Sequence, residues 1–335
     1  MITIWTQQEG RLVKQENADR ADQRNIWVDA RDVTREDIRI LEEEYGVSQE
    51  HILDILDQDE LSRIEKEDEY TLIIARLPVY IASDDVSYFT IPLGIVLYPG
   101  MLITICWTDC EVLKDIALNR IKGLSLKDFP AFIIRLLSRA DTIFLRYLKE
   151  INRRSTVIQK ELQLSIKNKE LIKLQNLEKS LVFFTTSLKS NQLLLEKLAK
   201  TRILRLDEED RDWLEDAEID NRQAIEMADT YSNIISGMSD AFASVISNNL
   251  NSVMKRLTVI SLILMIPTFI TSFFGMNIPL PFSDSGWLGV GVLILACGCS
   301  SIIAAILLRE KHQKSKRDEP TRRGRPRKML SGKSR

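Results

Sequence analysis

The chain has 335 residues, 44% of them hydrophobic, and a formal net charge of −2 at pH 7. Its length is enough for two or more folding units. The small net charge conceals a strong asymmetry. Residues 1–256 contain 34 basic and 44 acidic side chains, residues 257–308 contain one charged side chain, Asp284, and residues 309–335 contain 12 basic and 3 acidic ones. An acidic body, an almost uncharged segment and a basic tail argue against a protein that is soluble throughout.

Residues 1–125 are predicted to form a cytosolic mixed α/β domain. The β-rich stretches ITIW and IWVDA precede a helix in TREDIRILEEEYG, where Thr34 is the N-cap, Asp37 follows three residues later, and Gly46 is the stop signal. A second amphipathic helix begins at Ser48 in SQEHILDILDQ. Three β-rich runs follow, which we expect proline and glycine to break: YTLIIARLPVYI, FTIPLGIVLYP and MLITICW.

Residues 126–256 are predicted to form a cytosolic bundle of long antiparallel helices and a stalk. Gly and Pro almost vanish from 131 to 200, and Leu, Ile, Lys, Glu and Arg recur there at helical spacing. A third helical segment begins near LDEEDRDWLEDAEID. If it continues to Phe274, it is about 100 Å long and leads from the cytosolic domain straight into a membrane.

Two uncharged runs, 257–274 and 287–308, are each long enough to cross the ~30 Å hydrocarbon core of a membrane as a helix. We predict two transmembrane helices joined by an extracytoplasmic loop, 275–286. Basic residues precede the first run and follow the second, while the loop has none. The positive-inside rule therefore predicts a multi-pass protein of the cell membrane with both termini in the cytoplasm. No signal peptide is expected, since the first residues lack an apolar core.

A polar stripe follows the third helix in alternating steps of four and three residues, while the flanking positions are mostly Leu, Ile, Val, Phe and Ala. A 3.5-residue repeat marks a seam between parallel helices, and a polar seam in lipid must face protein or water. Two explanations stay open: tight packing of Ser and Thr, or a water-filled pore lined by equivalent helices of a symmetric homo-oligomer. The stripe comprises Asp240, Ser244, Ser247, Asn251, Met254, Thr258, Ser261, Met265, Thr268 and Ser272, and one further step reaches Gly275.

In such a pore, neutral Asn, Ser and Thr oxygens bind the water shell of an ion without trapping it, which suits small hard divalent cations, above all Mg²⁺. Met254 and Met265 would form apolar constrictions. No GxxxxGK[ST] loop is present, so we expect no nucleotide and movement down the electrochemical gradient. The four cysteines show no zinc-site spacing, and with His51 and His312 as the two histidines we expect no enzyme.

The triplet Gly275-Met276-Asn277 ends the first uncharged run in FFGMN. At this place it resembles the signature of the CorA-type magnesium transporters. The segment NSVMKRLTVISLILMIPTFITSFFGMN resembles that family's pore helix, and the similarity extends from about Asp54 to Lys311. The resemblance implies an α+β cytosolic domain with long stalk helices and two C-terminal transmembrane helices, assembled as a funnel-shaped homopentamer. It also implies passive, channel-like uptake of divalent cations: Mg²⁺, and also Co²⁺ and Ni²⁺.

The resemblance assigns roles to residues of this sequence. Gly275, Met276 and Asn277 would form the selectivity filter, where Asn277 oxygens bind the hydrated ion. Asp54 and Asp240 would bind a regulatory Mg²⁺ between subunits, and its loss would open the ring. Leu257 lies off the stripe and is added by the resemblance as a hydrophobic neck. Stripe and resemblance together predict a pore lined by Asn251, Met254, Leu257, Thr258, Ser261, Met265, Thr268 and Ser272.

Two features depart from the family pattern. Many members have an acidic segment after the triplet, whereas this chain offers one outer-loop acid, Asp284. Phe274 stands where Tyr is usual. Two alternatives stay open: a CorA-like zinc transporter, which shares the triplet, and a membrane-anchored scaffold that transports nothing, against which the polar stripe argues.

The basic tail, 309–335, is expected to be disordered. It contains RGRPRK, which resembles the AT-hook motif of minor-groove binders. Because the tail begins directly after a predicted membrane span, anionic lipid headgroups are the expected partner and nucleic acid is not.

Overall fold

The computed structural model describes residues 1–15, 25–83, 85–164, 168–201 and 203–275, together with residues 286, 287, 291, 292, 294, 295, 297–300, 302 and 303. The chain forms two compact units, Met1–Ala243 and Ser244–Arg335. Met276, Asn277, Asp284 and the predicted tail lie outside the described residues.

The first unit is built on one seven-stranded sheet with the strand order β2-β1-β3-β7-β6-β5-β4. Neighbouring strands are antiparallel except β3 and β7, which are parallel. All five predicted β-rich stretches are strands, while β2 and β4, short and rich in charge, were not predicted. The strands are β1 (Ile2–Gln8), β2 (Arg11–Gln15), β3 (Ile26–Arg31), β4 (Arg63–Lys66), β5 (Thr71–Tyr80), β6 (Tyr88–Tyr98) and β7 (Met101–Cys106).

The predicted break is confirmed at Pro99 and Gly100, which separate β6 from β7. It is wrong within the strands, because β5 continues through Pro78 and β6 through Pro92 and Gly94. Pro78 pairs with β6 but lies beyond the last residue of β5 that pairs with β4. Pro92 pairs with β5 but lies before Gly94, the first residue of β6 that pairs with β7. Each proline is therefore paired with one neighbouring strand only. On its other side there is no strand whose hydrogen bonds the missing N–H would interrupt.

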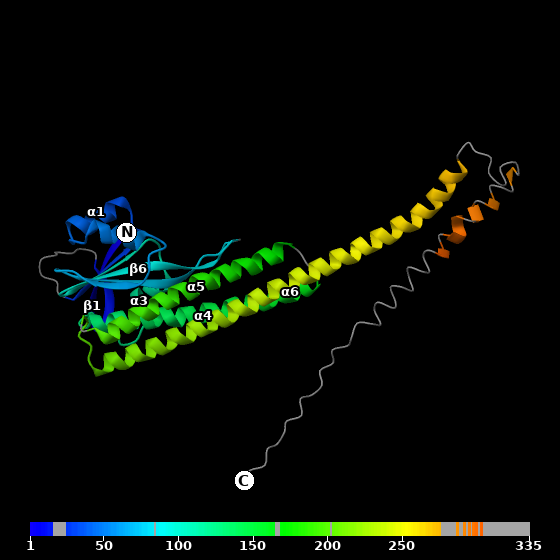
Figure 1. Ribbon diagram of the computed structural model, residues 1–335. Coiled ribbons are helices and arrows are strands. Elements are labelled where there is room, and N and C mark those ends of the chain that lie inside the picture. Colours follow the sequence, from blue (N-terminus) through cyan, green and yellow to red (C-terminus); the bar gives the residue numbers. More distant parts are fainter. Residues whose placement is uncertain are drawn as a thin grey trace, which may run out of the picture. The chain divides into compact units, whose positions relative to one another are not determined.

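Helices cover both faces of the sheet, as Figure 1 shows for α1 on one side and α3–α6 on the other. Alternate residues of β5 reach opposite cores: Leu72 and Ile74 pack with helices α1 (Arg35–Glu43) and α2 (Gln49–Leu56), whereas Ile73 faces α3 (Glu111–Ala117) and the long helices. A strand buried on both faces is a continuous apolar run in sequence, as this one is.

The two predicted short helices are confirmed. Thr34 closes a capping box on α1, because its hydroxyl accepts the N–H of Asp37 (3.3 Å) and the Asp37 carboxylate accepts the N–H of Thr34 (2.9 Å). Gly46 follows α1 with a φ of +73°, which favours glycine. Ser48 is the N-cap of α2, although its side chain makes no capping hydrogen bond.

The long helices are confirmed as α4 (Phe129–Leu164), α5 (Asn168–Lys200) and α6 (Glu208–Phe274), the last of 67 residues. Within the first unit they share a core that includes Phe144, Phe184 and Ile235. The last buried side chain of α6 is Phe242, and from Ala243 to Ser272, where every side chain is described, none is buried. The predicted boundaries at 125, 256, 274, 286 and 308 stay predictions.

A buried acid joins α4 to α6. Asp141 is 2% exposed, and its Oδ1 accepts a hydrogen bond from Asn221 Nδ2 at 3.0 Å. Burial, which outweighs this bond, raises the pKa of Asp141 to about 8. The folded state therefore binds the proton more tightly than the unfolded chain, so this contribution to stability is complete below about pH 4 and is lost as pH rises towards 8.

Asp141→Asn should therefore flatten the pH dependence of stability. Between pH 5 and 8 the wild type should lose up to about 1.4 kcal/mol per pH unit from this group, or a few degrees in melting temperature. Thermal unfolding of the purified protein across this range measures the slope, with exposed Asp216→Asn as the control. Equal slopes for wild type and Asp141→Asn would contradict the prediction.

Candidate functional site

The predicted pore residues lie on the part of α6 that belongs to the second unit. All eight of them, from Asn251 to Ser272, are exposed, so none belongs to the buried core of the described residues. The apolar part of this helix has a mean hydropathy of 1.8 over 18 residues and is 0% buried, and it is long enough to cross a membrane. A helix with these properties requires a cover of lipid or of other protein.

Three hydroxyl groups of the predicted pore lining share one hydrogen-bonding pattern. Thr258 donates to the carbonyl of Met254 (2.8 Å), Ser261 to that of Leu257 (2.9 Å) and Thr268 to that of Leu264 (2.8 Å). Each hydroxyl proton is thus used within the helix, and each oxygen keeps its lone pairs for an outside partner. The exposed stripe consequently offers acceptors, which suit a cation or the water around it.

Gly275 ends the helix, and its N–H donates to the carbonyl of Thr271 at 3.0 Å. Its partners in the predicted filter lie outside the described residues. The described residues of the second predicted span are helical, and Cys297 Sγ lies 4.0 Å from the carbonyl oxygen of Pro267. The two apolar segments therefore contact each other within this unit, as expected for packing by small residues.

Asp54, the first predicted regulatory ligand, lies on α2. This helix is fixed on the sheet by buried Ile52 and Ile55, and Gly94 of β6 makes room for it. A Cβ at Gly94 would lie 2.2 Å from Ile55 Cδ1 and 2.5 Å from Cγ1, which no ordinary contact allows. The absence of a side chain at this position lets α2 approach the sheet closely.

The Asp54 carboxylate has an ion-pair partner, Arg63 of β4. The distance from Oδ2 of Asp54 to Nη2 of Arg63 is 2.7 Å. Arg63 also pairs with Glu60 and, through Nε at 3.0 Å, with Glu65. One guanidinium thus holds three carboxylates together, and a metal ion at Asp54 must compete with it.

Asp240, the second predicted regulatory ligand, is exposed on α6. Asp54 and Asp240 come from different elements, and neither belongs to the clusters of possible metal ligands found in the described part of the chain. A site formed between two copies of the chain would not be assembled in one copy, so the regulatory assignment stays a prediction.

Two such clusters exist among the described residues. Asp128, Asp207 and Asp210 form one, and these acids serve as helix caps: Asp128 accepts the N–H of Ala131 (3.2 Å) and Asp207 that of Asp210 (2.8 Å). Burial is the main cause that raises the pKa of Asp210. The capping bonds account for this cluster without a metal.

The second cluster, His51, Glu65 and Glu67, was missed from the sequence. Its members belong to α2 and to the end of β4, which pack together only in the fold. The available signal was the spacing of Glu65 and Glu67, which places both side chains on one side of an extended segment.

A buried arginine fixes the loop between α2 and β4. Arg76 is 7% exposed and donates to the carbonyls of Gln58 and Glu60, and to the carbonyl and hydroxyl of Thr90. Burial is the main cause that lowers the pKa of its guanidinium. The amide of Asn191 on α5 bonds both the N–H (2.9 Å) and the carbonyl (2.8 Å) of Arg76.

An α+β unit followed by an exposed apolar helix of membrane-spanning length is the order of elements typical of a membrane protein with a large soluble domain. The family model described as "CorA-like Mg2+ transporter protein" matches residues 22–312. The chain belongs to this family, which confirms the resemblance seen in the sequence.

A curated relative and two solved structures agree with this membership. The chain is 27% identical over 282 residues to the "Cobalt/magnesium transport protein CorA" of Methanocaldococcus jannaschii, covering 82% of this chain and 88% of that protein. The complete structure of that organism's CorA magnesium transporter matches with a TM-score of 0.76 at 24% identity, covering 92% and 97% of the two chains. The ZntB cytoplasmic domain of Vibrio parahaemolyticus matches with a TM-score of 0.57 at 14% identity, covering 75% and 98%. These structural matches show a shared fold.

Loss of the buried guanidinium should destabilise the first unit. Arg76→Met removes a donor from the buried carbonyl and hydroxyl of Thr90 and from the carbonyls of Gln58 and Glu60, so we expect a loss of about 3–5 kcal/mol and a fall in melting temperature of about 10 °C. The control is Arg39→Met, which removes an exposed ion pair with Glu36 on α1. It should change the melting temperature by about one or two degrees. A shift for Arg76→Met as small as that of the control would refute this role.

Proposed function

We propose that the chain forms a homo-oligomer, a homopentamer as the family resemblance implies, that conducts divalent cations passively across a cell membrane. Mg²⁺ is the proposed main ion, with Co²⁺ and Ni²⁺ as further ions. Family membership and the name of the curated relative support the ion class. The single observation that carries the transport mechanism is the exposed stripe on α6, whose hydroxyl protons are used within the helix.

The stripe explains why several copies are required. One helix with outward-facing oxygen acceptors encloses no pathway, and two spans per chain enclose none either. Identical copies around an axis bring the stripes together, so that rings of Asn251, Thr258, Ser261 and Thr268 oxygens surround a water-filled path. In this arrangement the apolar remainder of the helix faces lipid or neighbouring spans.

The chemistry of the rings suits a hydrated divalent ion. Mg²⁺ dehydrates reluctantly, and neutral oxygens bind its water shell without holding the ion as a carboxylate would. Met254, Leu257 and Met265 are exposed apolar side chains at intervals along the same helix, and rings of them form necks that close by dewetting. An inside-negative membrane supplies ~4.6 kcal/mol per divalent ion at 100 mV, so no nucleotide is required.

The proposed topology places both termini in the cytoplasm, with 257–274 and 287–308 as the spans and 275–286 outside. The first unit is then cytosolic, and the basic tail lies beside anionic lipid on the same side. The proposed selectivity filter is Gly275, Met276 and Asn277 at the outer mouth, and Asp284 is the acid that attracts cations there.

We further propose that cytosolic Mg²⁺ closes the pathway by bridging Asp54 of one subunit and Asp240 of another. The ion pair between Asp54 and Arg63 affects this inhibition by Mg²⁺. Internal Mg²⁺ must displace a guanidinium at 2.7 Å before it reaches the carboxylate. Arg63 therefore sets the concentration at which Mg²⁺ inhibits, since it lowers the effective affinity of Asp54 for the ion.

Divalent flux into proteoliposomes tests the transport proposal. Mg²⁺, Co²⁺ and Ni²⁺ should enter with the wild type, and Asn277→Ala should lose selectivity among these ions and Zn²⁺. Asn249→Ala, which changes an exposed amide off the stripe, is the control and should behave as the wild type. If no divalent ion enters with the wild type, the transport proposal fails and the scaffold alternative gains support. Entry of Zn²⁺ alone would favour the zinc transporter.

Internal inhibition tests the regulatory proposal. Arg63→Gln should lower the inhibitory Mg²⁺ concentration by about fivefold, which corresponds to the loss of about 1 kcal/mol of competition at a partly exposed ion pair. Asp54→Ala with Asp240→Ala should abolish the inhibition. Arg39→Gln on α1 serves as the matched control. Unchanged inhibition in the double variant would show that these two acids are not the sensor.

A further inference from the structure

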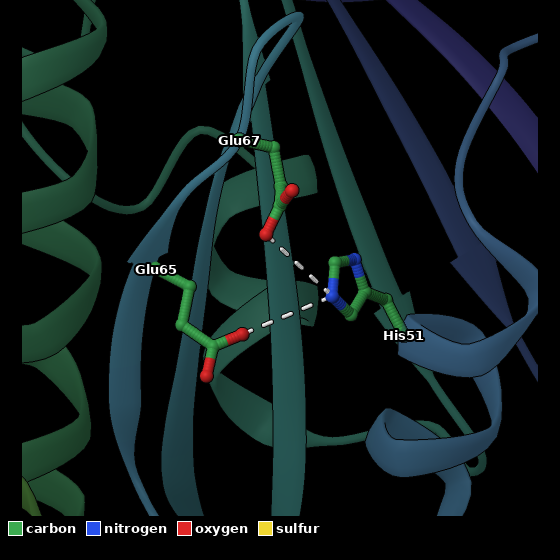
Figure 2. Close-up of side chains that lie close together, drawn as sticks. All are labelled: His51, Glu65 and Glu67. Atoms are coloured by element: carbon green, nitrogen blue, oxygen red, sulfur yellow. Dashed lines mark ion pairs between the residues drawn. The ribbon is translucent and has the colours of Figure 1, made fainter.

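Three side chains outside the proposed pathway converge on one point of the first unit. Figure 2 shows the carboxylates of Glu65 and Glu67 directed at the same ring nitrogen of His51. Nε2 of His51 lies 3.8 Å from Oε2 of Glu65 and 3.9 Å from Oε1 of Glu67. Both distances exceed that of a hydrogen bond. The ring nitrogen and the two carboxylate oxygens, the three potential metal ligands, therefore face one another without a hydrogen bond to the nitrogen.

The spacing of these atoms suits a small metal ion. One ligand atom from each residue lies within 4.8 Å of the other two. Tetrahedral bonds of about 2.0–2.2 Å place ligand atoms about 3.3–3.6 Å apart. Both glutamate side chains are partly exposed, 41% and 45%, so tight packing does not prevent their carboxylates from moving closer to the imidazole.

The imidazole is held in place from its other side. His51 is 15% exposed, and its Nδ1 lies 2.7 Å from the Tyr70 hydroxyl, which also accepts the N–H of Ser48 at 3.3 Å. The hydroxyl oxygen can accept a second hydrogen bond, from Nδ1–H, and in that tautomer Nε2 keeps its lone pair. A metal-bound histidine characteristically has such a partner on its second nitrogen.

The two glutamates are also oriented by partners of their own. Glu65 accepts Arg63 through Oε1, which leaves Oε2 towards His51. Glu67 follows β4, and its backbone N–H donates to the carbonyl of Tyr70 at 2.9 Å, which closes the turn between β4 and β5. The same Tyr70 residue thus fixes the ring of His51 through its side chain and the position of Glu67 through its backbone.

We infer that His51, Glu65 and Glu67 form a binding site for a first-row transition-metal cation of the Zn²⁺, Co²⁺ and Ni²⁺ class, with water completing the coordination. An imidazole nitrogen favours these ions, whereas Mg²⁺ prefers oxygen ligands. The site is distinct from the proposed Mg²⁺ sensor, although Glu65 shares Arg63 with Asp54. The site therefore places a metal of a different class beside the same network.

The experiment uses the full-length protein in detergent, stripped of metal and without an affinity tag, in millimolar Mg²⁺ to fill sites made of oxygen alone. Titration with Co²⁺ should give one equivalent per chain with a visible absorption spectrum of nitrogen and oxygen coordination. His51→Gln should abolish this spectrum, and Glu67→Gln should weaken the affinity about tenfold or more. The controls are His312→Gln, which changes the other histidine, and Asp128→Asn, which changes the capping cluster. Both variants should keep the Co²⁺ spectrum and the Co²⁺ affinity of the wild type.

The inference would be overturned if the wild type bound no Co²⁺ in the presence of Mg²⁺. It would also be overturned if His51→Gln and Glu67→Gln bound Co²⁺ as the wild type does. Glu67→Gln preserves the size of the side chain, so the test remains decisive if His51→Gln fails to fold. The readout is a binding spectrum that requires no ion flux. A failure of the transport proposal therefore leaves this result interpretable by itself.

Discussion

The exposure of α6 beyond Phe242 is the constraint on which the rest of the molecule depends. The first part of the helix is stabilised by packing against α4 and α5, whereas none of the described side chains from Ala243 to Ser272 is buried. Apolar surface in water costs about 25 cal/mol per Å², and a long helix without packing partners is marginal. A bilayer removes the apolar flanks from water, but the polar stripe on the same helix still requires protein or water. The proposed assembly in a membrane supplies both kinds of surface, lipid for the apolar flanks and equivalent helices for the polar stripe.

The first unit supplies a rigid support for charged residues. Gly94 makes room for Ile55 against the sheet, Arg76 fixes the loop after α2, and Asn191 of α5 accepts a hydrogen bond from the Ser62 hydroxyl of that loop. These buried contacts determine where Asp54, Arg63, His51 and Glu65 lie, although none of those four is in the apolar core. Such an arrangement tolerates many charges close together, because the fold does not depend on their mutual attraction.

Periodicity and capping predicted most of the fold. Thr34 and Asp37 at the correct spacing, long helical runs and apolar strands are local signals, and each was confirmed. The strands RLVKQ and RIEK were missed because they are short and charged, and Pro78 and Pro92 were misjudged because strand ends depend on neighbours. The pairing of Asp54 with Arg63 and the convergence of His51 with Glu65 and Glu67 join residues from separate elements, and no local pattern specifies which charges meet.

Arg63 shows how one such pairing changes the interpretation of a motif. In the sequence, Asp54 is one acid among many in an acidic body. In the fold, it already has a cationic partner, and so does Glu65. Any divalent ion that binds near α2 meets a positive charge that is part of the chain, and it must supply more favourable contacts than a guanidinium does. A resident cation of this kind gives a weak carboxylate site a threshold, because binding is an exchange of one cation for another. The fixed guanidinium distinguishes Asp54 in the last turn of α2 and Glu65 on β4 from an ordinary acidic surface, where counter-ions are mobile and screening is by salt.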